Sequence, residues 1–184
     1  PSDAALALDL MIHYPEKIKP LTSPSCELQK LRHLVEQRRT LVEDKRRLVN
    51  RLINALKQYY PQPLEWFVHR DTDLFCNFIN RWPTLQQLKR AHQTTVRRFF
   101  VSRGGRTVPK TDERIDAIKQ AVALTHDRAV IESHSLLVTT LSKQIQLLNA
   151  AIREFDQEIE VLFESMDDAR LIKSLPGIGH CLGP

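Results

Sequence analysis

A long row of apolar residues at alternating steps of three and four constrains this chain more than any other feature. The row runs through residues 127–167, and His134 is its one polar member. This spacing places every member along one side of a helix, where a stripe of such length is buried against another helix. The sequence therefore predicts a long helix with a helical partner. The row consists of Ile131, His134, Val138, Leu141, Ile145, Leu148, Ile152, Phe155, Ile159, Leu162 and Met166.

A second long helix is predicted over residues 25–60, and its charge complements the first. Val35, Val42 and Val49 recur every seven residues. Residues 28–60 contain nine Lys and Arg against three acidic residues, and residues 127–168 contain three against nine. Opposite charge favours pairing of the two helices, either within one chain or across a dimer. We expect a homodimer or higher homo-oligomer whose contact uses Ile131, Val138, Leu141, Ile145, Leu148, Ile152, Phe155, Ile159 and Leu162.

The rest of the pattern indicates an all-α fold. Strand-like alternation is scarce, and short helical segments fill residues 64–124 between breaks at proline and glycine. We predict two long coiled-coil helices flanking a small helical region, with a partial helix-hairpin-helix at the C-terminus. The expected central domain spans residues 25–168, with a basic helix at 25–60, small helices at 64–124 and an acidic coiled-coil helix at 127–167.

Composition narrows the class of protein. The net charge of +5 and pI near 9.3 point mildly to a polyanionic partner. The three cysteines lie far apart and outside any metal-ligand spacing, so free thiols in a reducing compartment are expected. No apolar run reaches the ~20 residues of a membrane span, and no signal peptide is visible. We therefore expect a cytoplasmic protein without a membrane partner.

Two sets of cations are candidate phosphate contacts. Arg39, Arg46, Arg47 and Arg51 lie off the apolar row of the long helix predicted over residues 25–60. Residues 89–110 form a second basic cluster without an acid, and Phe99 and Phe100 interrupt it. Guanidinium groups suit phosphate oxygens. The alternative for both sets is a solvated surface, with the phenylalanines in the core. The candidate phosphate ligands of the second cluster are Arg97, Arg98, Arg103, Arg106 and Lys110.

A third candidate is the "LPGIGHCL" stretch, which is typical of the hairpin in a helix-hairpin-helix unit. Gly177 and Gly179 permit the sharp turn, and the amides that follow would face a DNA phosphate. The alternative is an ordinary Pro-Gly turn between helices.

Four stretches, taken in order, resemble one family. "SDAALALDLM" is similar to the close of the "KTDxxDAxxLA" signature of the DEDD, Piv-like insertion-sequence transposases, the bridge-RNA-guided recombinases. "LRHLVEQRRTLVEDKRRLVNRLINALKQYYP" is similar to the segment that follows it in that family. "INRWPTLQQLKRA" matches the family's "rfPTxxxla" stretch, and "LIKSLPGIGHCLGP" resembles the opening of its C-terminal transposase domain. The resemblance covers essentially the whole chain.

The resemblance implies a bacterial or archaeal DNA recombinase that works with Mg²⁺, DNA and a structured guide RNA. It implies a RuvC-like nuclease domain, a helical middle and a C-terminal domain with a nucleophilic serine. Residues 1–24 would then be a remnant of the catalytic domain and a linker, and residues 169–184 the start of the C-terminal domain. Asp3 aligns with the last acid of the metal-binding set, although the residues alone favour a helix cap. An internal fragment of this kind is expected to be inactive.

The sequence without the family resemblance is also compatible with two other classes of protein. A coiled-coil scaffold would bind protein only, and a DNA-binding regulator would have no catalytic parent.

Overall fold

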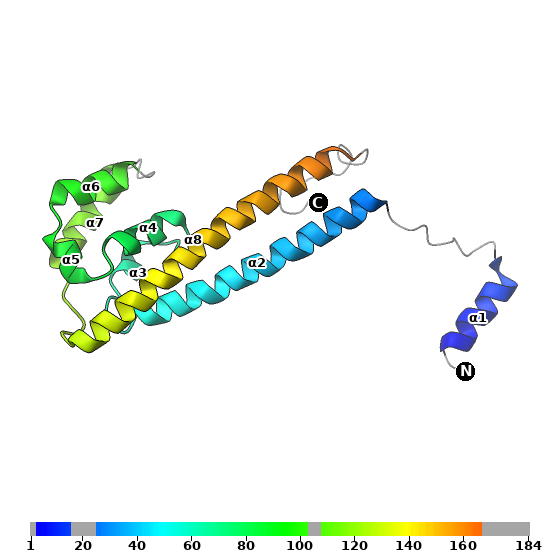
Figure 1. The fold of residues 1–184 in the computed structure, drawn as a ribbon, viewed down its shortest axis with the longest axis horizontal. Coiled ribbons are helices and arrows are strands. Elements are labelled where there is room, and N and C mark those ends of the chain that lie inside the picture. Colours follow the sequence, from blue (N-terminus) through cyan, green and yellow to red (C-terminus); the bar gives the residue numbers. More distant parts are fainter. Residues whose placement is uncertain (1–2, 16–24, 103–107, 167–184) are drawn as a thin grey trace.

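The computed structural model describes residues 3–15, 25–102 and 108–166, and its regular elements in these ranges are helices (Figure 1). The predicted all-α class is confirmed. None of the described helices is long and apolar enough to cross a membrane. The helices are α1 (Asp3–His13), α2 (Cys26–Leu56), α3 (Pro63–Trp66), α4 (Asp73–Arg81), α5 (Leu85–Arg90), α6 (Gln93–Ser102), α7 (Val108–Gln120) and α8 (Arg128–Glu164).

The two long helices begin at side-chain caps that the sequence supplies. The Ser25 hydroxyl accepts a hydrogen bond from the Leu28 amide at 3.2 Å, which starts α2. The Asp127 carboxylate accepts from the Ala129 and Val130 amides, which starts α8. Each cap satisfies amides that have no partner within the first turn of a helix. The helices therefore begin within a residue or two of the predicted positions, while α2 ends four residues earlier than predicted.

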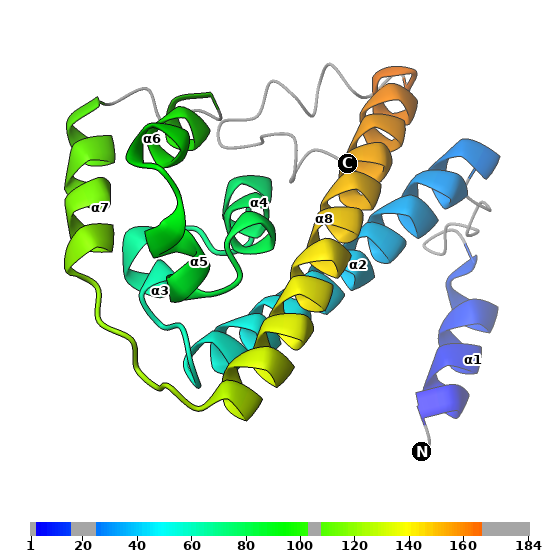
Figure 2. The ribbon, with the colours of Figure 1, turned by 60° about the vertical axis from the view of Figure 1, so that its left-hand side comes forward.

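α2 and α8 pack against each other in antiparallel orientation, as Figures 1 and 2 show. Near the start of α2, Leu31 is buried with Ile159 and Phe163 from the end of α8. Near the end of α2, Leu52 belongs to the same buried cluster as Val138 from the first half of α8. The predicted pairing of a basic with an acidic helix is thus found within one chain.

A small aromatic domain fills the space beside the helix pair. Phe78 of α4 lies at its centre and contacts the rings of five other residues, at centroid distances from 5.0 to 6.1 Å. Tilted and edge-to-face ring pairs of this kind stabilise a core beyond the area they bury. The interpretation of Phe99 and Phe100 as core residues is confirmed. The five ring partners of Phe78 are Trp66, Phe67, Trp82, Phe99 and Phe100.

Amide side chains join α4 to α8. The Ser142 hydroxyl donates to Asn80 Oδ1 at 2.6 Å, and Asn80 Nδ2 donates to Gln146 Oε1 at 2.9 Å. Asn149 Nδ2 and Arg153 Nη1 both donate to the Asp73 carboxylate, each at 2.9 Å. These bonds satisfy polar groups that would otherwise be costly beside the core. They also fix the position of the aromatic domain along α8.

Burial in the α2–α8 contact predicts a large stability effect at Leu141. Its side chain is 2% exposed, whereas that of Leu124 is 56% exposed. Leu141→Ala should lower the free energy of unfolding by roughly 2–5 kcal/mol because it removes buried methyl groups and leaves a cavity. Leu124→Ala, the matched control, should change it by less than about 0.5 kcal/mol. Urea denaturation followed by circular dichroism measures both, and equal effects would contradict this packing.

The Asp73 carboxylate predicts a pH dependence of stability. Burial raises its pKa, but hydrogen bonds from Asn149 and Arg153 and the charges of Arg153 and Lys45 outweigh burial and hold it below 3.8. Its contribution is therefore complete above the unfolded-state pKa and is lost as pH falls through the lowered folded-state value.

Asp73→Asn should consequently flatten the loss of stability below about pH 4, near the usual pKa of Asp. Asp116→Asn, at an exposed pair with Lys119 on α7, is the control and should keep the parent profile. Denaturation midpoints between pH 3 and pH 6 test this, and parallel profiles for the parent and Asp73→Asn would refute it.

Candidate nucleic-acid interface

Six of the eight Lys and Arg residues of α2 form an inner and an outer set, and the other two, Lys30 and Arg32, lie near its start. Arg38 and Lys45 lie three residues after Val35 and Val42, on the side of α2 that bears its apolar row, and their side chains are 25% and 20% exposed. Arg38 Nε donates to Asp156 Oδ1 of α8 at 2.5 Å, and Lys45 Nζ donates to Asp71 Oδ2 at 3.3 Å. These two cations are therefore neutralised inside the fold. Their aliphatic stems line the contact while their charged ends reach an acid.

The outer set consists of the four predicted phosphate ligands of α2, all of which are exposed. Arg39 and Arg47 have side chains 83% and 72% exposed, and acids of the same helix pair with both. Arg39 Nε lies 3.8 Å from a Glu43 carboxylate oxygen, and Arg47 Nη1 lies 3.1 Å from Asp44 Oδ1. Ion pairs this exposed contribute little to stability. They nevertheless reduce the charge that a polyanion would meet.

Arg46 and Arg51 are exposed and form no ion pair with any residue that the structure describes. Their position follows from helical spacing, which places Arg39 and Arg46 in one row and Arg47 and Arg51 in a neighbouring row. Each row thus contains one paired and one unpaired arginine. Within the outer set, the unpaired positive charge is therefore that of Arg46 and Arg51. Lys30, near the start of α2, is likewise exposed and forms no ion pair with a described residue.

The second basic cluster lies on α5 and α6. Lys89 and Arg90 are exposed in the last turn of α5, and Arg98 is exposed on α6. Arg97, next to it, pairs with Asp112 of α7. Arg103 and Arg106 lie outside the described residues, as does the side chain of Lys110. Lys110 itself lies within α7. Gly177 and Gly179, the predicted hairpin glycines, also lie outside the described residues.

The structure does not bring the two clusters together. In Figures 1 and 2, α4 and α8 lie between α6 and α2.

Arg114 of α7 is a half-buried cation that sequence reasoning missed. Its guanidinium lies 5.5 Å from the Phe67 ring centroid and 5.4 Å from that of Phe100. Such cation–π contacts stabilise packing. Arg114 is thus a structural cation, and nothing in its local sequence distinguishes it from an exposed one.

The residues expected to form a dimer contact lie against α2 and α4 of the same chain. Val138, Leu141 and Ile145 are buried in the main core, and Ile152 and Ile159 are buried further along α8. Self-association through this side of α8 stays a prediction, and it would require α2 to come from a second chain. The remaining expected contact residues, Ile131, Leu148, Phe155 and Leu162, are half-buried.

Asp3, the predicted orphaned metal ligand, is exposed in the first turn of α1. Within the described ranges, no three His, Cys, Asp or Glu residues are grouped so that they could hold a metal ion. A Mg²⁺ site needs several oxygen ligands around one point. The described residues therefore do not fit the metal that the family resemblance implies, and no catalytic step can be assigned to them.

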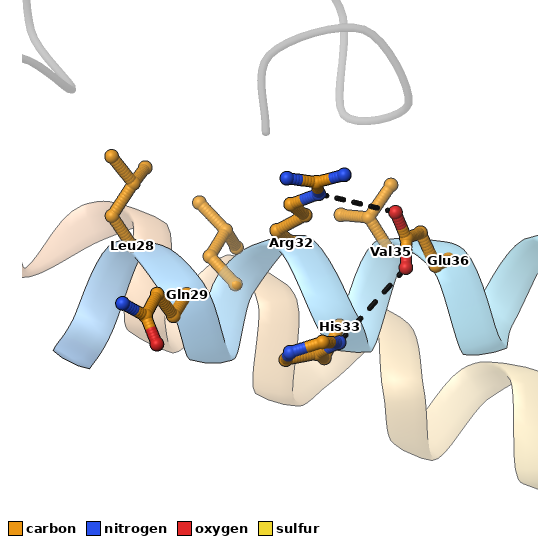
Figure 3. A pocket seen from close by; sticks show the side chains of 7 residues that line it. Leu28, Gln29, Arg32, His33, Val35 and Glu36 are labelled. Atoms are coloured by element: carbon orange, nitrogen blue, oxygen red, sulfur yellow. Dashed lines mark hydrogen bonds and ion pairs between the residues drawn. The ribbon is translucent and has the colours of Figure 1, made fainter. Parts of the chain in front are cut away.

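A hollow of about 890 Å³ lies along the first turns of α2 (Figure 3). Leu28, Leu31 and Val35 supply its apolar walls, and Glu36 pairs with Arg32 at 3.2 Å and with His33 at 3.9 Å. Because Glu36 offsets the charge of Arg32, the hollow is poorly suited to a phosphate group.

The comparisons with known proteins show which class of protein the chain resembles. Residues 1–61, which include all of α1 and α2, match the DEDD family model of IS110 elements, described as a transposase. The resemblance to insertion-element transposases that the motifs indicated is therefore confirmed, and the chain is a relative of the IS110-family transposases.

The similarity extends beyond the region of the family model. An insertion element IS116 protein of Streptomyces clavuligerus, named as an uncharacterized 44.8 kDa protein, is 30% identical over 169 residues. The match covers 89% of this chain and 41% of the relative, so the chain spans less than half of that protein's length. No solved structure matches the chain significantly.

Proposed function

We propose that this chain is the central nucleic-acid-binding segment of an IS110-family transposase, a DNA recombinase that moves an insertion sequence. The supporting observation is the exposed arginine set of α2, within the region that matches the transposase family. In the whole protein, the segment would work in the cytoplasm on DNA and a structured guide RNA. It would act as a dimer or higher homo-oligomer, and Mg²⁺ would be held by residues outside those described here.

The distribution of charge over the helix pair indicates which of its sides would face nucleic acid. Asp156 of α8 and Asp71 neutralise the inner cations of α2, so its remaining positive charge lies on exposed side chains, chiefly the outer arginines. Exposed acids such as Glu154 and Glu158 make the outer side of α8 negative. A phosphate backbone is attracted to the first surface and repelled by the second. Nucleic acid is therefore proposed to lie along α2, on the side away from α8.

Arginines lined up along the outer side of α2 are proposed to follow a phosphate backbone instead of reading base edges. Binding should consequently depend weakly on sequence and strongly on salt, because each phosphate contact releases counterions. Structured RNA should compete well with duplex DNA, since both present closely spaced phosphates. A salt-dependent affinity for nucleic acid distinguishes this proposal from the alternative of a scaffold that binds only protein.

The salt dependence of binding tests the two unpaired arginines. Arg46→Gln with Arg51→Gln should lower the slope of log affinity against log salt by roughly 0.7–0.9 for each lost phosphate contact. The control Arg128→Gln with Glu132→Gln removes an exposed ion pair of α8 and keeps the net charge, so its slope should match the parent. Fluorescence anisotropy with a structured RNA and a DNA duplex measures both variants.

A second variant tests the alternative that the outer surface of α2 is only solvated and contacts no nucleic acid. It changes all four outer arginines of α2 to Gln. If it stays folded and neither its affinity nor its salt slope differs from the parent, α2 does not contact nucleic acid.

The chain by itself is expected to lack nuclease and strand-transfer activity. Asp3 is a single exposed carboxylate, whereas phosphodiester cleavage by metal ions needs a clamped site. Incubation with supercoiled plasmid and Mg²⁺ should leave the plasmid intact for both the parent and Asp3→Ala. Cleavage by the parent that Asp3→Ala abolishes would contradict this expectation.

A further inference from the structure

A second row of residues follows the side of α8 that faces away from α2. Leu136, Leu147 and Val161 are 71%, 72% and 69% exposed. They are separated by eleven and fourteen residues, which are close to three and four helical turns, so they share one side of the helix. Single exposed aliphatic side chains are common on protein surfaces, so the residues between these three decide whether this side is a contact surface.

Positions between these three continue the row in steps of four and three. The complete row is symmetric about a point between Leu147 and Ala150. If a second α8 is laid antiparallel over this point, Leu136 faces Val161 and Leu147 faces Ala150. The same overlay places Thr140 opposite Gln157 and Lys143 opposite Glu154. Apolar positions thus meet apolar ones, polar meet polar, and the cation meets the anion.

We propose that α8 docks through this outer row onto α8 of a second copy of the chain, in antiparallel orientation. A two-fold axis makes the contact closed and self-complementary, which limits assembly to a pair. Lys143 and Glu154 form no ion pair with any residue in the described ranges, so both are available to a partner. Parallel docking would align Lys143 with its own copy and Glu154 with its own copy, and like charges across such a contact are unfavourable.

This docking is compatible with the packing inside each chain. The outer row lies opposite the side of α8 that α2 covers, so no buried residue has to be exposed. In the pair, the α2 helices lie on the two outer sides, with their arginines accessible. The inference deepens the self-association included in the proposed function by naming the surface and the orientation.

Charge exchange tests the contact. In the absence of nucleic acid, sedimentation velocity over a range of concentrations should show a reversible dimer of the parent. Lys143→Glu and Glu154→Lys should each weaken dimerisation at least tenfold, because each places like charges opposite one another twice. The double variant should regain parental dimerisation. A monomeric parent at high micromolar concentration, or single variants that dimerise like the parent, would overturn the proposal.

A disulfide experiment tests the orientation. Chains with Leu136→Cys and chains with Val161→Cys, both with Cys26 and Cys181 changed to Ser, are mixed and oxidised. Antiparallel docking predicts a mixed disulfide between the two kinds of chain, while bonds between two Leu136→Cys chains would overturn it. Both measurements are made without nucleic acid. A negative result would therefore reject the α8 contact and leave the proposed arginine–phosphate contacts untouched.

Discussion

The antiparallel contact between α2 and α8 is the interaction on which the rest of the fold depends. Each long helix has an apolar stripe that is unfavourable in water, and each has an excess of the charge that the other lacks. Burial of the two stripes against each other stabilises the helix pair, and pairs such as Arg38–Asp156 set the alignment. The aromatic domain packs against this pair in one shared core, and side-chain hydrogen bonds between α4 and α8 join it further.

The same contact sorts the cations of α2 by function. Of the cations in the apolar row, Arg38 pairs with Asp156 across the contact and Lys45 pairs with Asp71 just before α4, so neither is free to bind a phosphate. Arginine outside the row stays in water, where Glu43 and Asp44 compensate part of the charge. Arg46 and Arg51 are left for a polyanionic partner. The surface of α2 that is suited to nucleic acid is therefore much smaller than the number of its basic residues suggests.

The sequence predicts the long helices well because caps, apolar spacing and terminating prolines are local signals. It cannot decide whether α2 and α8 pair within a chain or between chains, since the same periodicity serves both. The bonds from Ser142 and Asn149 to α4 depend on residues more than sixty positions apart, and no local pattern indicates them. The acids that pair with Arg39 and Arg47 were visible at helical spacing. The outer row of α8 was also visible, but the stronger inner row obscured it.

The most direct test of this account is whether α2 and α8 of one chain are in contact in solution. Arg38→Cys with Asp156→Cys, in a chain with Cys26 and Cys181 changed to Ser, places two thiols on facing sides of the pair. A short bis-maleimide should link them within a single chain, so that the product keeps the mass of one chain plus the linker at all protein concentrations. Linkage mainly between two chains, or no linkage under conditions where the protein is folded, would contradict the account.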